Sequence, residues 1–153
     1  MSNTFTQIHI QCVFAPKFRL ALIDKSWKEE LNKYITGITQ SYGHKMIAIN
    51  SMPDHLHMFF GMRPNQSLSD LMQNVKRDSS EWINERRLTY GRFAWQEGYG
   101  GFSYEKSRIK VVADYIENQE IHHKKKSFLE EYKEILDEFG IEFDEKYLFK
   151  EPV

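Results

Sequence analysis

Long hydrophobic runs are absent from this chain of 153 residues, and cysteine is almost absent. No apolar stretch approaches the roughly 18 residues of a membrane span, and the N-terminal residues lack the basic leader of a signal peptide. We therefore expect a cytoplasmic protein with no membrane partner. The single cysteine, Cys12, excludes an intrachain disulfide and alternates with apolar residues, which indicates packing in a core.

The sequence also lacks internal repeats, low-complexity tracts and linkers rich in proline or glycine. Its length suits one compact domain and is too short for two ordinary ones. Hydrophobic residues make up 41% of the chain and aromatic residues 14%, values typical of a folded protein rather than a disordered one. We expect a single domain over residues 1–153.

A strong net charge is missing as well, since the formal charge is −1. The balance is uneven, however: residues 1–126 carry 18 Lys and Arg against 13 Asp and Glu, whereas residues 127–153 carry 3 against 9. An acidic C-terminal helix and tail therefore follow a basic body, and basic residues interleaved with aromatic ones are typical of a groove for single-stranded nucleic acid. A solvated helix face explains each basic cluster equally well. The candidate DNA-binding residues are Lys17, Arg19, Lys76, Arg77, Lys106 and Arg108.

The pattern of apolar residues predicts strands and helices in alternation. Period-two spacing predicts strands over residues 5–14, 44–50 and 55–61, and a Gly-punctuated aromatic run over 93–104 indicates a further strand or irregular hairpin. Helical spacing predicts one helix from Ser26, one from Ser67, one from near Ser107 and one from Ser127. The order β-α-β-β-α-β-α-α predicts an α+β fold, a mainly antiparallel sheet flanked by helices.

Four polar side chains suggest one metal-assisted phosphoryl-transfer site. His55 and His57 stand two apart on a predicted strand, so they point to the same face and can share one cation, while Leu56 points the other way. We expect both rings at the mouth of a cleft. Tyr115 and Gln119 are four residues apart in a predicted helix, so the phenol lies beside the amide. Tyr115 would be the nucleophile and Gln119 a third ligand.

Neither half of this set is specific by itself. Two alternate histidines arise by chance in a chain with six, and a boundary tyrosine on an amphipathic helix usually only packs. Histidine-triad hydrolases need a third alternate histidine, but position 59 is Phe59. Zinc sites usually recruit further Cys or His at characteristic spacing, which is absent.

The ordered combination of motifs is specific, and it covers nearly the whole chain. It resembles the single-tyrosine HUH transposases of the smallest bacterial insertion sequences, the IS200-like family, and their repeat-associated relatives. The resemblance implies a ferredoxin-like or RRM-like HUH fold, with His55 and His57 as the HUH pair, Gln119 completing the metal site and Tyr115 as the nucleophile. The acidic segment 127–153 is not explained by it. The motifs are HIQCVFAPKFR, PDHLHMFFG, WQEGYGGFSYEKS, and YIENQEIHHKK followed by SFLEEY.

The resemblance also implies a substrate and an assembly. The substrate would be single-stranded DNA with hairpin ends, cleaved and rejoined through a 5′-phosphotyrosine, and the protein would be a homodimer whose tyrosine helix can serve the partner's histidines. A mixed imidazole and oxygen ligand set suits Mn²⁺ and tolerates Mg²⁺. Two alternatives stay open: a non-catalytic DNA-binding or regulatory protein that keeps the fold, and a metal phosphoesterase in which water attacks.

Overall fold

The computed structural model describes residues 3–153 and contains one four-stranded antiparallel sheet with the strand order β2-β3-β1-β4. The predicted α+β architecture is confirmed. The strands are β1 (His9–Phe14), β2 (Lys45–Met52), β3 (His55–Gly61) and β4 (Gly100–Ser103). The helices are α1 (Lys28–Ser41), α2 (Leu68–Glu85), α3 (Ile109–Glu117), α4 (Gln119–His122) and α5 (Phe128–Glu138), with short 3₁₀ turns η1 (Arg19–Ala21), η2 (Lys106–Arg108) and η3 (Glu145–Tyr147).

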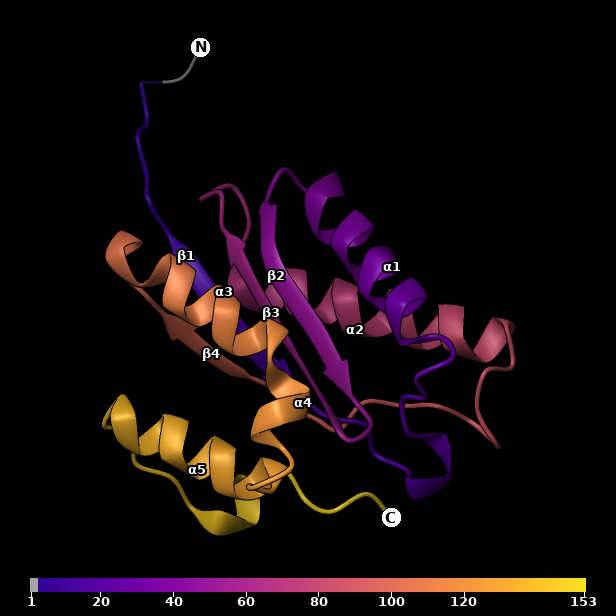
Figure 1. Cartoon of the computed structure of the whole chain (residues 1–153). Helices are drawn as coiled ribbons and strands as arrows, with labels where there is room; N and C mark the ends of the chain where they lie inside the picture. The colour runs from indigo at the N-terminus through magenta and orange to yellow at the C-terminus, as the bar shows by residue number, and fades with distance from the viewer. Residues whose placement is uncertain (1–2) are drawn as a thin grey trace.

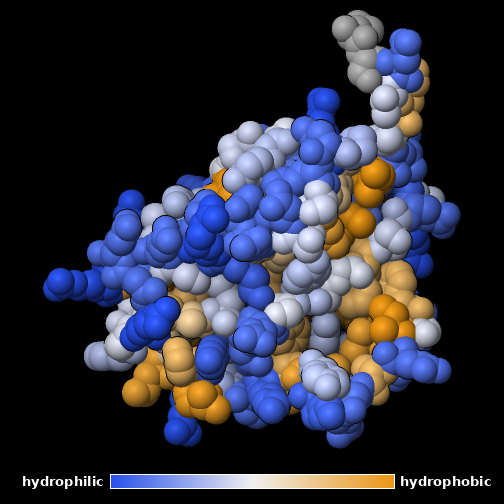
Figure 2. All heavy atoms as spheres, turned by 180° about the vertical axis from the view of Figure 1, so that it is seen from behind, coloured by the Kyte–Doolittle hydropathy of each residue, from blue (hydrophilic) through white to orange (hydrophobic). Residues whose placement is uncertain are grey.

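The sheet separates two helical layers (Figure 1). On one side lie α1 and α2, where Ser51 of β2 donates a hydrogen bond to Asn32 of α1. On the other side lie α3, α4 and α5, and here Val112 of α3 packs on Phe59 of β3. Seen from behind, the α2 layer presents mostly hydrophilic residues, and the N-terminal segment that begins at residue 3 projects from the rest of the molecule (Figure 2). No helix within residues 3–153 is long and apolar enough to cross a membrane.

Strand β3 lies inside the sheet and is buried from His55 to Phe60. Its alternation sends Leu56, Met58 and Phe60 toward α1 and α2, where they join the main apolar core. The histidines and Phe59 point toward α3, α4 and α5. A strand covered on both faces needs partners for every polar side chain that it carries.

Two of the predicted helix ends are confirmed. Ser67 accepts a hydrogen bond from the Asp70 backbone N–H at the start of α2, and Ser127 accepts one from Glu130 at the start of α5. The cap at Ser26 is wrong, because α1 begins only at Lys28. There the backbone N–H of Ser26 donates to Asp24, so the serine belongs to the preceding turn.

The helix expected to carry both Tyr115 and Gln119 is broken between them. Asn118 leaves the helical conformation at φ −100° and ψ 23°, so that Tyr115 lies in α3 and Gln119 opens α4. The Asn118 side chain donates to the carbonyl of Asp114 at 2.8 Å. Such local bonding competes with helical continuation.

Candidate active site

His55 and His57 lie beneath helix α5 rather than at the mouth of an open cleft. Both rings are fully buried, which corrects the expectation of an exposed pair. The ring of Phe128, the first residue of α5, stacks on His55 with 4.2 Å between centroids and 6° between planes. An apolar residue of the C-terminal segment therefore covers one histidine directly.

Nδ1 of each histidine lies within hydrogen-bond distance of an acceptor. Nδ1 of His57 lies 2.7 Å from the amide oxygen of Gln11, and Nδ1 of His55 lies 2.7 Å from a carboxylate oxygen of Asp54. Because both partners are acceptors, each Nδ1 carries a proton and donates it. Histidine ligands of metals are usually anchored in this way, which leaves Nε2 free to bind. Gln11 comes from the polar side of β1.

Gln119 is fully buried beside the histidine pair. Its amide oxygen lies 3.1 Å from Nε2 of His55 and 2.8 Å from Nε2 of His123. Its amide nitrogen donates to Glu131 at 3.1 Å. Although the helix is broken after α3, Gln119 still lies beside the histidines, because its side chain points inward from the start of α4.

Tyr115 is half-buried at the edge of the same region. Its hydroxyl donates a hydrogen bond to the Glu131 carboxylate. Its ring centroid lies 6.3 Å from that of His57, and His122 stacks on its other side at 4.5 Å. The structure thus brings together the four side chains that the sequence singles out.

Glu131 of α5 joins these groups, and sequence reasoning missed it. The residue is only 2% exposed. One carboxylate oxygen lies 3.1 Å from Nε2 of His57 and 3.2 Å from Nε2 of His123, while the other accepts hydrogen bonds from Tyr115 and Gln119. His123 was missed as well.

A signal for Glu131 is present in the sequence. Position 131 falls three residues after Phe128 and four before Ile135, on the apolar stripe of α5. A carboxylate at such a position must be buried and therefore needs partners.

Burial and hydrogen bonding perturb three titrating groups in the site. Burial raises the pKa of the Tyr115 phenol, and the hydrogen bond to Glu131 raises it further. Burial alone would raise the pKa of Glu131, but its contacts with His123 and His57 and the hydrogen bond from Tyr115 outweigh it and hold the pKa well below its usual range. Burial lowers the pKa of His57. These directions leave Glu131 anionic, Tyr115 protonated and His57 neutral.

The donor set fits a divalent cation. Ligand atoms of His55, His57 and Glu131 all lie within 4.8 Å of one another. With its proton on Nδ1, neutral His57 turns the Nε2 lone pair toward an anionic carboxylate oxygen 3.1 Å away, an arrangement that a shared cation would relieve. Neighbouring ligands about 2.1 Å from an octahedral ion lie about 3 Å apart. The Gln119 oxygen, 3.1 Å from Nε2 of His55, offers a further neutral ligand atom.

Of the predicted DNA-binding residues, Arg108 lies nearest the site. It lines a cavity of about 180 Å³ together with Gln11, Tyr115 and Glu131, and Lys106 is exposed two residues earlier in η2. A second cavity of about 440 Å³ on another side of Tyr115 is lined by further lysines, Lys125 and Lys126.

The other four cations lie away from the histidines. Lys17 and Arg19 are exposed in the segment after β1. Lys76 and Arg77 belong to α2, on the opposite face of the sheet. The Lys76 ammonium donates to the carbonyls of Gln96 and Gly98 at 2.8 and 2.6 Å, and burial lowers its pKa to about 8.

Comparison with known proteins identifies relatives for most of the chain. The family model for IS200-like transposases matches residues 4–119. The ISDra2 transposase TnpA of Deinococcus radiodurans is 20% identical over 118 residues, which cover 74% of this chain and 84% of that protein. Helix α5, with Glu131, lies beyond the residues that the family model matches.

Two solved structures share the fold. A protein from Deinococcus radiodurans R1 proposed to be a transposase has a TM-score of 0.61 and 19% identity, over 78% of this chain and 95% of its own. The REP-associated tyrosine transposase bound to a REP hairpin has a TM-score of 0.59 and 13% identity, over 80% of this chain and 74% of its own. At these identities the likeness shows a common fold.

Proposed function

This chain belongs to the family of IS200-like transposases, as its motifs predict, and from that membership we propose that it cleaves and rejoins single-stranded DNA with Tyr115 as the nucleophile. One observation carries the proposal: the Tyr115 hydroxyl and Nε2 of His57 both contact the buried carboxylate of Glu131. A nucleophile beside a candidate metal site is what phosphodiester cleavage requires.

In the proposed reaction the Tyr115 oxygen bonds to the scissile phosphorus while the bond from phosphorus to the 3′ oxygen breaks. The phenol gives up its proton and the leaving 3′ oxygen takes one up, so the products are a 5′-phosphotyrosine and a free 3′-OH. Because the new ester conserves the energy of the broken linkage, attack by a second 3′-OH reverses the step and joins strands without ATP.

The chain's own groups prepare this step. Glu131 accepts the hydrogen bond of Tyr115 and so orients the attacking oxygen. Gln11 holds His57 in the tautomer that directs Nε2 inward. When bound by His55, His57 and the oxygens of Gln119 or Glu131, Mg²⁺ or Mn²⁺ would supply Lewis-acid polarisation of the phosphate.

The proposed substrate is single-stranded DNA with hairpin ends. The REP-associated tyrosine transposase, which shares this fold, was solved bound to a REP hairpin, and the basic body of residues 1–126 offers cations for phosphates. The proposed assembly is a homodimer, which rests on the family resemblance. Light scattering that finds only an 18.3 kDa particle at micromolar concentration would exclude it.

The experiment that tests this function is a search for the covalent intermediate. Wild type and Tyr115→Phe are incubated with Mg²⁺ or Mn²⁺ and pooled single-stranded oligonucleotides, with and without hairpins, and run on a denaturing gel. We expect a protein–DNA adduct with wild type only, and only in the presence of the metal ion. Cleavage without an adduct would instead assign attack to water, and binding without cleavage would make the protein a non-catalytic DNA-binding one.

A mixture of two inactive variants tests whether the site is composite. His55→Ala lacks a metal ligand and Tyr115→Phe lacks the nucleophile, so restored cleavage in the mixture would require a tyrosine helix that serves the partner's histidines. Continued inactivity of the mixture would place both halves of the site within one subunit.

A further inference from the structure

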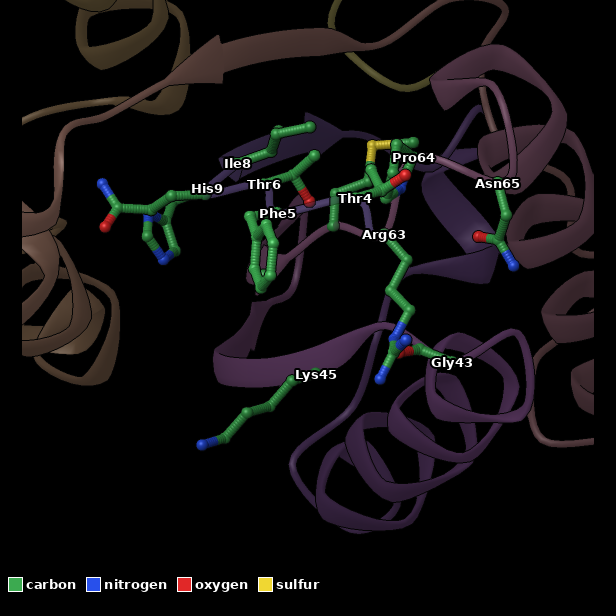
Figure 3. Close-up of a pocket in the computed structure, with 13 residues that line it drawn as sticks. Thr4, Phe5, Thr6, Ile8, His9, Gly43, Lys45, Arg63, Pro64 and Asn65 are labelled. Carbon is green, nitrogen blue, oxygen red and sulfur yellow. The ribbon is translucent and has the colours of Figure 1, made fainter. Parts of the chain in front are cut away.

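A groove lies between the N-terminal segment 4–9, the start of β2 (residues 43–45) and the end of β3 with the residues that follow it (61–65), and we call it the N-terminal groove. Its volume is about 760 Å³, within the range of about 300–1,000 Å³ of ligand sites. Figure 3 shows Phe5 projecting from the N-terminal segment toward β2, with Arg63 on one side and Lys45 on the other. None of the candidate active-site residues lines it.

The chemistry of the groove is aromatic and cationic. The ring of Phe5 is 92% exposed, so it offers a free face for stacking. Lys45 and Arg63 are exposed and form no ion pair within residues 3–153, and no Asp or Glu lines the groove. An anionic ligand with flat rings is therefore complementary to it.

Arg63 is held in place by the backbone. Its Nε donates to the Gly43 carbonyl at 3.1 Å, and Gly43 adopts φ +91°, a left-handed conformation that favours glycine. A Cβ at this position would lie 3.4 Å from Cδ of Arg63. The guanidinium is thus positioned in advance, although no carboxylate among residues 3–153 pairs with it.

The groove opens on the same face of the sheet as the histidines. His9 and Lys45 both pair with Gly61, which is four residues along β3 from His57 on the same side of the strand. That separation is roughly 13 Å, a distance that about four stacked nucleotides span. The backbone N–H of Tyr104 donates to the His9 carbonyl at 3.0 Å.

The hydrogen bond between Tyr104 and His9 joins the groove to predicted DNA-binding residues. Lys106 and Arg108 follow Tyr104 by two and four residues, and Arg108 lines the cavity beside Tyr115. Two exposed cations therefore lie between the groove and the cavity beside the nucleophile, a cavity that Glu131, Glu134 and Glu138 also line.

We propose that the N-terminal groove binds a single-stranded segment of the DNA substrate, with a base stacked on Phe5 and backbone phosphates at Lys45 and Arg63. The inference rests on the proposed action on single-stranded DNA and extends it by assigning a binding site away from the reacting phosphate. Phe5 supplies affinity for any base, because every base has a face to stack, and the two cations supply the dependence on salt.

Fluorescence anisotropy with labelled oligothymidylate, which forms no hairpin, tests the site. Phe5→Ala should weaken binding by at least about fivefold, whereas Phe5→Trp should retain it. The double variant Lys45→Ala/Arg63→Ala should reduce the slope of log K against log salt by about 1.4, since two phosphate contacts on a single strand contribute about 0.7 each. Unchanged affinity and unchanged slope would overturn the proposal.

Two matched controls lie outside the groove. Lys33→Ala removes an exposed lysine of α1, and Tyr90→Ala removes an aromatic ring that is 85% exposed. Both should bind oligothymidylate as wild type does. Losses as large as those of the groove variants would mean that any surface cation or ring contributes equally, which would contradict a defined site.

Adduct formation separates the failure of this inference from the failure of the proposed function. If wild type forms the adduct while the groove variants bind as tightly as wild type, the groove assignment is wrong and the function stands. If wild type neither binds single-stranded DNA nor forms an adduct, the proposed function itself is wrong. A change in particle mass by light scattering in the groove variants, with affinity unchanged, would assign the groove to a second copy of this chain instead.

Discussion

On one face of β3, Leu56, Met58 and Phe60 pack among apolar side chains in the core that α1 and α2 cover, whereas on the other face His55 and His57 meet polar groups from separate elements. Both faces are completely buried. An apolar face is satisfied by any close-packed set of the right volume. A polar face requires a matched partner for each donor and acceptor, because an unpaired polar group costs free energy when it is buried.

Glu131 shows what this requirement means for the molecule. Its single carboxylate accepts hydrogen bonds from Tyr115 and Gln119 and lies 3.1 Å from Nε2 of His57. These three residues come from two helices and a strand. The acidic segment 127–153 therefore contributes to the candidate site and is more than a charged tail. Helix α5 supplies one of the polar partners of this face, and its first residue, Phe128, covers His55.

The largest expected effect comes from removing one oxygen on the polar face. Tyr115→Phe should reduce adduct formation and cleavage by at least about 10⁴-fold, because the attacking atom is lost. Its affinity for hairpin DNA should stay within a few-fold of wild type, since phosphate contacts and stacking are unaffected. Gel assays of the adduct and anisotropy of binding measure the two quantities. Cleavage at the wild-type rate would transfer the attack to water.

Removing the shared carboxylate should produce the next largest effect. Glu131→Ala leaves Tyr115 and Gln119 without their acceptor and removes the carboxylate partner of His123, and breaking such a buried pair costs about 3–5 kcal/mol. Urea denaturation measures the loss of unfolding free energy. Glu138→Ala, an exposed carboxylate in the same helix, is the control and should change stability by less than about 0.5 kcal/mol. Equal losses of unfolding free energy in the two variants would show that Glu131 does not stabilise the polar face through its buried contacts.

A pair of substitutions on β3 compares its two faces directly. Met58→Ala should lower stability by about 2–5 kcal/mol through the cavity that it leaves, yet keep any stabilisation by Mn²⁺. His57→Ala should abolish that stabilisation, which for wild type reaches about 2.7 kcal/mol when free Mn²⁺ is a hundred times its dissociation constant. Thermal unfolding with and without Mn²⁺ gives both values. Retention of the Mn²⁺ effect in His57→Ala would refute the metal assignment.

The smallest expected effect concerns the anchoring of α5 over the polar face. Ser127 caps this helix by accepting a hydrogen bond from Glu130, so Ser127→Ala should cost about 1 kcal/mol. Ser107→Ala is the matched control, because this exposed serine has no side-chain hydrogen bond among residues 3–153. Differential scanning calorimetry resolves the two. A midpoint that falls equally in both variants would count against a specific contribution of the cap.

Local patterns were sufficient for most of the elements and for part of the site. Alternation predicted β3 and placed His55 and His57 on one face, while helical spacing and the serine caps predicted α2 and α5. The expectation of one continuous helix through Gln119 was wrong. Nothing in the local pattern distinguishes Asn118 from a helical residue. In the structure, however, its side chain donates a hydrogen bond to the Asp114 carbonyl, which competes with helical continuation.

What the sequence by itself determined is the order of the elements, the α+β class and the placement of His55 and His57 on one face of β3, because periods of two and 3.6 residues arise from the local geometry of the backbone. Only the tertiary structure decided that α5 closes over that pair and brings Glu131 to His57 from 74 residues away. The physical reason is that the partners of a core-facing helix residue come from elements distant in the sequence, so local patterns do not identify them. An acidic residue on an apolar stripe therefore shows that a partner must exist, but does not show which one.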